Sequence, residues 1–403
     1  MGATLPTGTI PAVRHTPEPQ QVRFAMAGLL LLGGLFGAVG ALPALWSFAL
    51  SLDAVGTGIC FASLAVSMLA TMLTSGQLRH RNRLPARGAA AAGAFLIGAA
   101  MIALSFVDRD SWLPYPLAVA GLGMGLTAAA TGESLSRALT RRRAPALLHL
   151  SGAFFGFGAV AVCGVAWLLA EPLGWQNLCR LLGAMAIVLA VGIWRGPKLV
   201  IEKADLPAGA SKTTPITILL FLTLLIQACN HGLLGGWLAL YLTRQFEITT
   251  LGSLGVLMAF WTALTCGRVL AGRLAAFGNR TRTAAVVSGF VVLGCLFLLN
   301  SVERSGVVAG SLLLGAGMGA LHPLTLEYVA HSPVAPAAGL FRLTFATTLL
   351  VGLGSAAGAA PLANTHGIDA VMWLALWLAV ATPVALALIA IETRLSAAAA
   401  PAG

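Results

Sequence analysis

The chain consists of long apolar runs separated by short polar segments. Each run is long enough to cross a hydrocarbon core of ~30 Å as an α-helix. Helices are expected because, in lipid, every backbone amide must be satisfied within its own segment. Twelve such runs are predicted, at 24–50, 54–77, 88–107, 114–136, 146–169, 175–195, 216–241, 251–275, 283–301, 305–330, 337–361 and 368–391.

The polar segments divide these runs into two sets of six. The longest internal one, 196–215, contains Lys198, Glu202, Lys203 and Asp205 and is interpreted as a cytoplasmic linker. The sequence therefore predicts an all-α polytopic membrane protein with twelve transmembrane helices in two pseudo-symmetric six-helix bundles. Its parts are a disordered cytoplasmic N-terminal tail at 1–23, bundles at 24–195 and 216–391, the linker between them, and a C-terminal tail at 392–403.

Composition supports a membrane setting. Only 9% of the residues are charged, 58% are hydrophobic, and the mean hydropathy is +0.90. A soluble domain carries about 25% charged residues to cover its surface. Most of this chain's surface must therefore face lipid.

Basic and acidic residues are distributed unequally between the two sides of the membrane. If both ends lie on one side, most of the 24 Lys and Arg residues fall on that side. Acidic residues gather on the opposite side, at Asp53, Asp108, Asp110, Glu171, Glu247, Glu303 and Asp369. The positive-inside rule then predicts cytoplasmic termini and a multi-pass protein of the plasma (inner) membrane. The net charge of +11 thus reflects orientation and is not interpreted as nucleic-acid binding.

The two sets of runs contain an internal repeat. At a shift of 194 residues, the stretch AVAGLGMGLTAAATGE at 118–133 recurs as LLLGAGMGALHPLTLE at 312–327. Both stretches lie in the fourth helix of their half, and Glu133 matches Glu327. Parallel repeats of this kind are typical of one large class of transporters.

At this point the chain resembles the major facilitator superfamily over all twelve spans. The loop SGQLRHRNR at 75–83 resembles that superfamily's basic loop motif. The stretches LHLSGAFFGFGA (148–159), WTALTCGRVLAGRLA (261–275) and AGLFRL (338–343) are similar to its fucose–glucose–galactose proton symporter branch. The resemblance implies two bundles that rock around a central site, lined by the first and fourth helices of each half.

Polar residues within the spans are the candidates for a substrate site. His231 stands midway along the seventh helix, beside Asn230 and about one turn after Gln227, where Gly232, Gly235 and Gly236 predict a local break in the helix. His322 precedes Pro323 in the tenth helix and could face the same cavity. Each histidine can instead be hydrogen-bonded between helices. Trp261 could stack on a ligand, whereas Trp237, near the outer end of its helix, fits an interfacial anchor.

Ionisable residues near the helix ends are the candidates for a gate or for proton coupling. Glu133 is followed at i+4 by Arg137, which suits an ion pair. Two arginines lie within spans and need a carboxylate, carbonyl groups or an anionic substrate, because a guanidinium keeps its proton. The full candidate set is Glu133, Glu327, Arg137, Arg268, Arg342 and His149. A salt-bridge gate and a proton site remain open alternatives.

The sequence predicts a secondary active transporter of a small polar or amphipathic solute, sugar-like or a metabolite, that works by alternating access with or without protons. The alternatives are a drug or metabolite efflux pump of the same superfamily and a non-transporting membrane receptor or scaffold. No enzyme motif emerges, and no cofactor or metal site is expected. We expect a monomer in the lipid bilayer whose partners are a small-molecule substrate and, if coupled, protons, with no nucleic acid.

Overall fold

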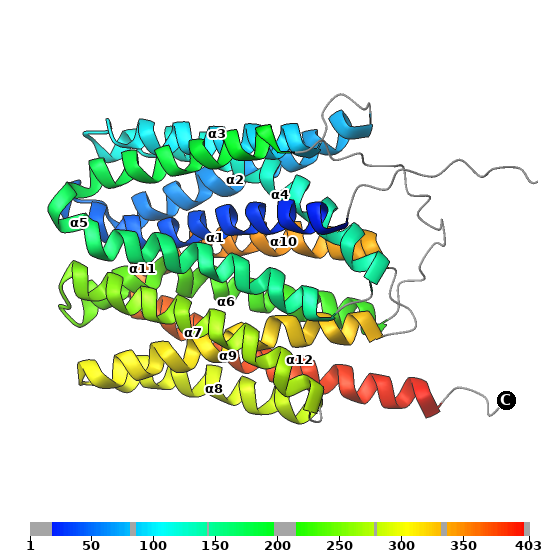
Figure 1. Cartoon of the computed structure of the whole chain (residues 1–403). Coiled ribbons are helices and arrows are strands. Elements are labelled where there is room, and N and C mark those ends of the chain that lie inside the picture. Colours follow the sequence, from blue (N-terminus) through cyan, green and yellow to red (C-terminus); the bar gives the residue numbers. More distant parts are fainter. Residues whose placement is uncertain are drawn as a thin grey trace, which may run out of the picture.

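The computed structural model describes residues 18–80, 86–142, 145–196, 215–277, 280–331 and 337–398. Within these ranges all regular structure is helical (Figure 1). The first half contains α1 (Glu18–Ala49), α2 (Ala54–His80), α3 (Ala86–Leu104), the short 3-10 helix η1 (Asp110–Trp112), α4 (Pro114–Arg142) and α5 (Pro145–Arg195). The second contains α6 (Pro215–Gln245), α7 (Thr250–Phe277), α8 (Arg280–Asn300), α9 (Arg304–His331), α10 (Ala337–Gly358), α11 (Ala360–His366) and α12 (Asp369–Ala398).

Eleven helical segments of the described chain are long and apolar enough to cross a membrane, and one of them crosses twice. The segment His149–Arg195 has 47 residues, about 70 Å of helix, which is more than twice the hydrocarbon thickness. The backbone leaves the helical conformation at Gly174 (φ 72°, ψ 159°), two residues after Pro172. A positive φ favours glycine, and Figure 1 shows α5 turning back there, so the prediction of twelve crossings is confirmed.

Two helices extend beyond the apolar runs that predicted them. α1 begins at Glu18, inside the segment 1–23 assigned to the tail, and α12 continues to Ala398, inside the segment 392–403. Hydropathy marks the edge of the hydrocarbon, whereas a helix can continue into water on residues of good helix propensity such as Glu, Gln and Arg. The rest of the N-terminal tail and nearly all of the linker 196–215 lie outside the described residues.

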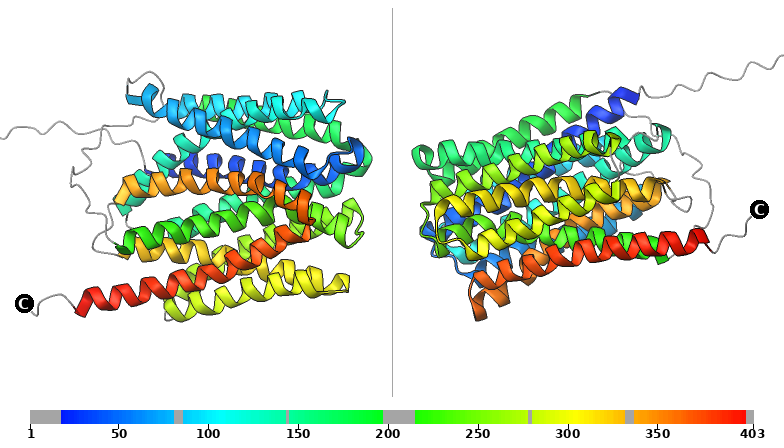
Figure 2. Two further views of the ribbon diagram at one scale, coloured as in Figure 1. Left: turned by 180° about the vertical axis from the view of Figure 1, so that it is seen from behind. Right: turned by 90° about the horizontal axis from the view of Figure 1, so that it is seen from below.

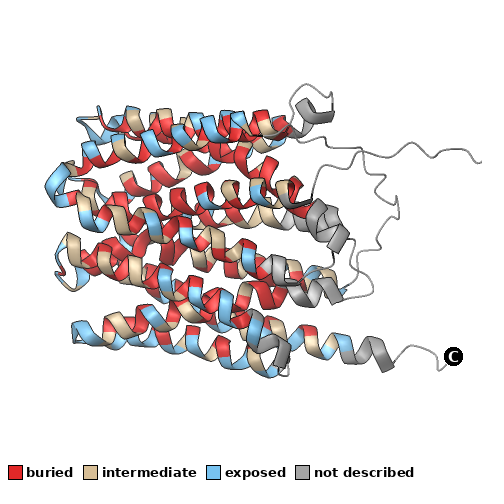
Figure 3. Ribbon diagram, viewed as in Figure 1, coloured by how far each residue is buried: buried red, intermediate tan, exposed pale blue. Residues whose placement is uncertain are grey.

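The helices lie side by side in one layered bundle, and α1 begins and α12 ends at the same face of it (Figures 1 and 2). We call this the terminal face and the opposite one the far face. Buried residues occupy the inward sides of the helices (Figure 3), and many large apolar residues are exposed. Val66, Phe106, Val188 and Trp377 are each about two-thirds exposed or more. A soluble protein rarely exposes so much contiguous apolar surface, so this is a multi-pass membrane protein whose outer surface faces lipid.

The glycine repeat corresponds to the same helix packing in both halves. On α4, Gly121 and Gly125 face α2 near Leu64 and Met68, while Gly123 faces Gly93 of α3. On α9, the matching Gly315 and Gly319 face α7, while Gly317 faces α8. In both halves the fourth crossing therefore packs closely against the second and third crossings, with backbone against backbone. Small residues at such positions replace the hydrophobic driving force that is missing between helices in lipid.

Candidate functional site

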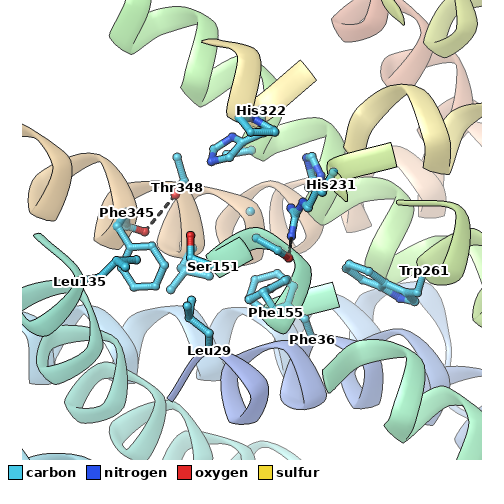
Figure 4. Close-up of a pocket in the computed structure, with 16 residues that line it drawn as sticks. Leu29, Phe36, Leu135, Ser151, Phe155, His231, Trp261, His322, Phe345 and Thr348 are labelled. Atoms are coloured by element: carbon cyan, nitrogen blue, oxygen red, sulfur yellow. Dashed lines mark hydrogen bonds between the residues drawn. The ribbon is translucent and has the colours of Figure 1, made fainter. Parts of the chain in front are cut away.

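A cavity of about 100 Å³ lies between the two halves (Figure 4). α1, α4 and α5 of the first half and α6, α7, α9 and α10 of the second contribute to its wall. Its polar lining residues are Ser151, His231, Arg268, His322 and Thr348, and its aromatic ones are Phe36, Phe155, Trp261 and Phe345. The wall is therefore largely apolar with a few polar groups, as is typical of small-molecule sites.

Arg268 is the only fixed positive charge among the described residues that line the cavity, and it is 6% exposed. Its Nη1 donates a hydrogen bond to the carbonyl oxygen of Gly152 on α5 at 2.6 Å, while its Nε has no hydrogen-bond partner in the described part of the chain. The guanidinium carbon lies 5.5 Å from the ring centre of Phe155, which suits a cation–π contact. Gly152 leaves room for this side chain, since a Cβ added there would lie 3.0 Å from Cδ of Arg268.

The structure brings His231 and His322 together on the cavity wall, with ring centres 6.3 Å apart. Nδ1 of His231 lies 2.9 Å from the carbonyl oxygen of Gln227 one turn earlier. Because a carbonyl only accepts, Nδ1 must carry the hydrogen, and in the neutral ring Nε2 is then an acceptor. Nε2 is buried and has no partner among the described residues. His231 thus has one unused polar atom.

Gln227 and Asn230, two further candidates for the substrate site, do not line the cavity. Gln227 donates through Nε2 to Oγ1 of Thr325 on α9 at 2.9 Å, which ties two helices of the same half together. Asn230 is buried, and no described residue donates a hydrogen bond to its Oδ1. Gln227 lies one helical turn before His231 on the same side of α6, but its amide is bonded to α9, and only the histidine lines the cavity.

The helix break predicted around Gly232 is wrong, because α6 is continuous from Pro215 to Gln245. The glycines instead allow other helices to approach. A Cβ on Gly232 would overlap Gly352 of α10, and one on Gly236 would lie 3.2 Å from the ring of Phe61 on α2. The glycines thus reflect close packing against neighbouring helices.

Three of the gate candidates can be placed. Nδ1 of His149 lies 3.0 Å from the backbone carbonyl oxygen of Arg268, so these two residues join α5 to α7 across the halves. Glu133 is partly buried on α4 and does not line the cavity. The side chains of Arg137, Glu327 and Arg342 lie outside the described part of the chain.

Contacts between the halves separate the cavity from the far face. Gly40 of α1 packs against the backbone of Gly235 of α6, and Gly58 of α2 packs against Ala360 of α11. Nη2 of Arg244 donates to the carbonyl oxygen of Leu52 at 2.8 Å. We call these three contacts the far-face seal.

An apolar layer lies on the side of the cavity toward the terminal face. Ala25, Met26 and Leu29 of α1 pack with Leu135 of α4, and Phe345 of α10 packs against this cluster. Leu29, Leu135 and Phe345 also line the cavity (Figure 4). In the described chain, therefore, contacts between the halves flank the cavity on both sides.

Sequence reasoning missed most of the apolar wall. Phe36 and Phe155 are two of 17 phenylalanines, and nothing in a uniformly apolar helix marks which of them faces inward. Trp237 was predicted at the interface, but it is fully buried and donates through Nε1 to the carbonyl oxygen of Ala356 at 2.9 Å. Trp261 is also fully buried and borders the cavity, as a ligand-stacking residue must.

Comparison with known proteins gives two findings. A family model described as Major Facilitator Superfamily matches residues 24–359. The crystal structure of the human organic anion transporter MFSD10 (TETRAN) is similar to this chain with a TM-score of 0.66 and 14% sequence identity, over 92% of this chain and 100% of that one. No curated protein sequence matches the chain. At 14% identity, the likeness to the solved structure shows the fold alone.

Proposed function

This chain belongs to the major facilitator superfamily, and we propose that it is a secondary active transporter that moves a small polar or amphipathic solute by alternating access. It is a transporter and not an enzyme. The proposal includes an orientation with both termini in the cytoplasm and a location in the plasma membrane, supported by the excess of Lys and Arg in the segments of the terminal face.

The observation that carries the proposal is the position of the cavity. Its wall is shared by both halves, and it lies between the far-face seal and the apolar layer of Leu29, Leu135 and Phe345. A site at the interface of two repeats becomes accessible from one face or the other when the repeats rock about it. Opening either side requires only that one set of contacts between the halves separates.

We further propose that α5 and α7 form part of the gate. Two hydrogen bonds join them, one from the Arg268 side chain to the carbonyl of Gly152 and one between His149 and the carbonyl of Arg268. Both lie where α5 begins and α7 ends, toward the terminal face. Glu133, together with Arg137, Glu327 and Arg342, remains a proposed salt-bridge gate or proton site. If Glu133 acts in the gate, Glu133→Gln will change the labelling of cysteines introduced at the terminal face, and unchanged labelling would contradict this role.

The cavity favours an amphipathic metabolite over a sugar. A sugar presents hydroxyl groups around its whole ring, and each hydroxyl that loses water needs a hydrogen-bond partner. Here four aromatic rings and several aliphatic side chains form most of the wall. Transport of an amphipathic metabolite, in either direction, therefore fits better than the sugar symport suggested by the resemblance at 148–159.

The test is counterflow in proteoliposomes that contain the purified full-length chain. A panel of radiolabelled sugars, amines, carboxylates and neutral aromatic compounds is measured with and without an imposed pH gradient. We expect saturable exchange of at least one amphipathic compound, with a raised KM in His231→Ala. Stimulation by the gradient would indicate proton coupling. If no compound shows saturable exchange, a non-transporting receptor or scaffold becomes the better interpretation.

A further inference from the structure

We infer that the solute is an organic monocarboxylate with an aliphatic or aromatic body, and that Arg268 binds its carboxylate. This inference rests on the proposed transport function and adds the chemical class of the substrate. It is carried by the contacts of Arg268, the charges around the cavity and the nature of its wall.

The guanidinium of Arg268 retains hydrogen-bonding capacity toward the cavity. Arginine has five N–H donors in a fixed planar fork that matches a carboxylate. Among the described residues, the Gly152 carbonyl is the only hydrogen-bond acceptor of this side chain, and the buried Nε has none. A buried donor without an acceptor is costly, and more so when it is charged. An anionic ligand would supply that acceptor.

The cavity contains no compensating negative charge among its described lining residues. Its other polar groups are two histidines, Ser151 and Thr348, none of which is an acid. A buried cation without a counter-charge is strongly disfavoured. One fixed positive charge calls for one negative charge on the solute, so a dicarboxylate or a phosphate dianion would leave charge unbalanced.

The rest of the wall determines the body of the solute. Phe155 lies beside both Phe36 and Trp261, with ring centres 5.4 Å and 6.2 Å apart, and it also carries the Arg268 guanidinium on its face. The charged end of a ligand at Arg268 is therefore next to aromatic surface. A cavity of about 100 Å³ limits the body to a small ring or a short chain.

Arg268 also connects recognition to the gate. The same guanidinium that would hold the carboxylate bridges α7 to the α5 carbonyl of Gly152. A carboxylate bound to the other N–H groups of this fork would be held by the same side chain that bonds α5, and these hydrogen bonds would be charge-assisted. Binding would thus act directly on a side chain that joins α5 to α7.

The experiment measures ligand-induced thermal stabilisation of the full-length chain in lipid nanodiscs, which avoids the leak of weak acids through vesicles. The ligands form two sets, and the members of each set share one carbon skeleton but differ in the polar group. The aromatic set is benzoate, benzamide, benzyl alcohol and benzylamine, and the aliphatic set is hexanoate, hexanamide and hexylamine. The variants are Arg268→Gln, Arg268→Lys and Glu327→Gln. The control is Arg180→Gln, which removes an exposed arginine near the far face that donates to Ser105 and Asn177.

We expect carboxylates alone to stabilise the natural chain and Arg180→Gln. Arg268→Gln should weaken carboxylate binding by about 10- to 100-fold, the range of a charge-assisted hydrogen bond. Arg268→Lys keeps the charge but loses the planar fork, so an intermediate affinity is expected. A folded Arg268→Lys protein keeps the test valid if Arg268→Gln does not fold.

Three results would overturn the inference. Amides or amines could bind as well as carboxylates, Arg268→Lys could leave carboxylate affinity unchanged, or carboxylates could bind only to Glu327→Gln, which would mean that Glu327 neutralises Arg268 in the natural chain. If carboxylates do not bind but another class of compound exchanges in counterflow, the proposed transport function is retained and only the monocarboxylate assignment is wrong. If no compound binds or exchanges, both proposals fail.

Discussion

The substitution Gly40→Ala tests whether the far face opens. Gly40 of α1 and Gly235 of α6 belong to different halves and touch at the far-face seal. A methyl group added at Gly40 would overlap the carbonyl oxygen of Gly235 and lie 3.3 Å from its carbonyl carbon. These are backbone atoms, so the contact cannot be relieved by rotating a side chain. The clash exists only while the two halves are together on this side.

The size of the expected effect follows from the clash being present in the closed state and absent in the open state. Overpacking a tight contact costs typically 1–3 kcal/mol, and a factor of ten corresponds to about 1.4 kcal/mol. The higher helix propensity of alanine stabilises α1 equally in the open and closed states, so it does not change the free-energy difference between them. The ratio of open to closed far face should therefore rise by roughly 5- to 150-fold.

The assay is labelling of a single cysteine at Leu52 with a membrane-impermeant maleimide, after the six native cysteines have been replaced. Leu52 is 2% exposed, and its carbonyl accepts the Arg244 hydrogen bond of the seal. While the closed form dominates, the labelling rate follows the open fraction, so Gly40→Ala should raise it by the same factor. Gly354→Ala is the matched control, because a Cβ at Gly354 meets nothing within 4 Å.

An unchanged labelling rate in folded Gly40→Ala protein would refute the reasoning. It would mean that the two halves do not separate at α1 and α6, or that the closed state absorbs the methyl group by a small shift of the helices. Equal acceleration by Gly40→Ala and Gly354→Ala would likewise show that the effect does not come from the seal.

Three further predictions concern the same contacts and the packing behind them. Arg244→Gln removes one partly buried hydrogen bond of the seal and should raise Leu52→Cys labelling by only about 2- to 10-fold; an effect larger than that of Gly40→Ala would contradict the assigned roles. Gly319→Ala would place a Cβ 2.7 Å from the carbonyl carbon of Leu264, so it should lower the free energy of unfolding by about 1–3 kcal/mol, measured in a thermal melt. Gly289→Ala on α8 is the control, because a Cβ there has open space around it and should not lower this free energy. Trp237→Phe leaves the buried carbonyl of Ala356 without its donor and should cost about 1–3 kcal/mol or more in the same melt, while Trp377→Phe at the lipid surface should leave the melt unchanged.

The candidate site shows how far sequence reasoning reaches in such a chain. His231, His322, Trp261 and Arg268 drew attention because polar or amphipathic residues are rare within apolar spans, and the structure places all four on one cavity. The same rarity drew attention to Gln227 and Asn230, which lie off the cavity. Gln227 shows that a polar residue in a span can be bonded to a neighbouring helix of the same half as readily as to a ligand.

The number of crossings, the lipid-facing character and the duplication of the two halves were determined by the sequence alone. Each span satisfies its own backbone hydrogen bonds in lipid, so its length and hydropathy can be judged one segment at a time. The glycine repeat can also be recognised within a single span, because small residues mark the positions where a neighbouring helix packs closely.

The rotation of each helix about its axis was decided only by the tertiary structure. In lipid, every side of an apolar helix is compatible with its surroundings, so hydropathy does not distinguish an inward face from an outward one. Packing against other helices settles the choice. That packing placed Phe155 beside Arg268, turned Trp237 toward Ala356 and brought two histidines from different helices to one wall.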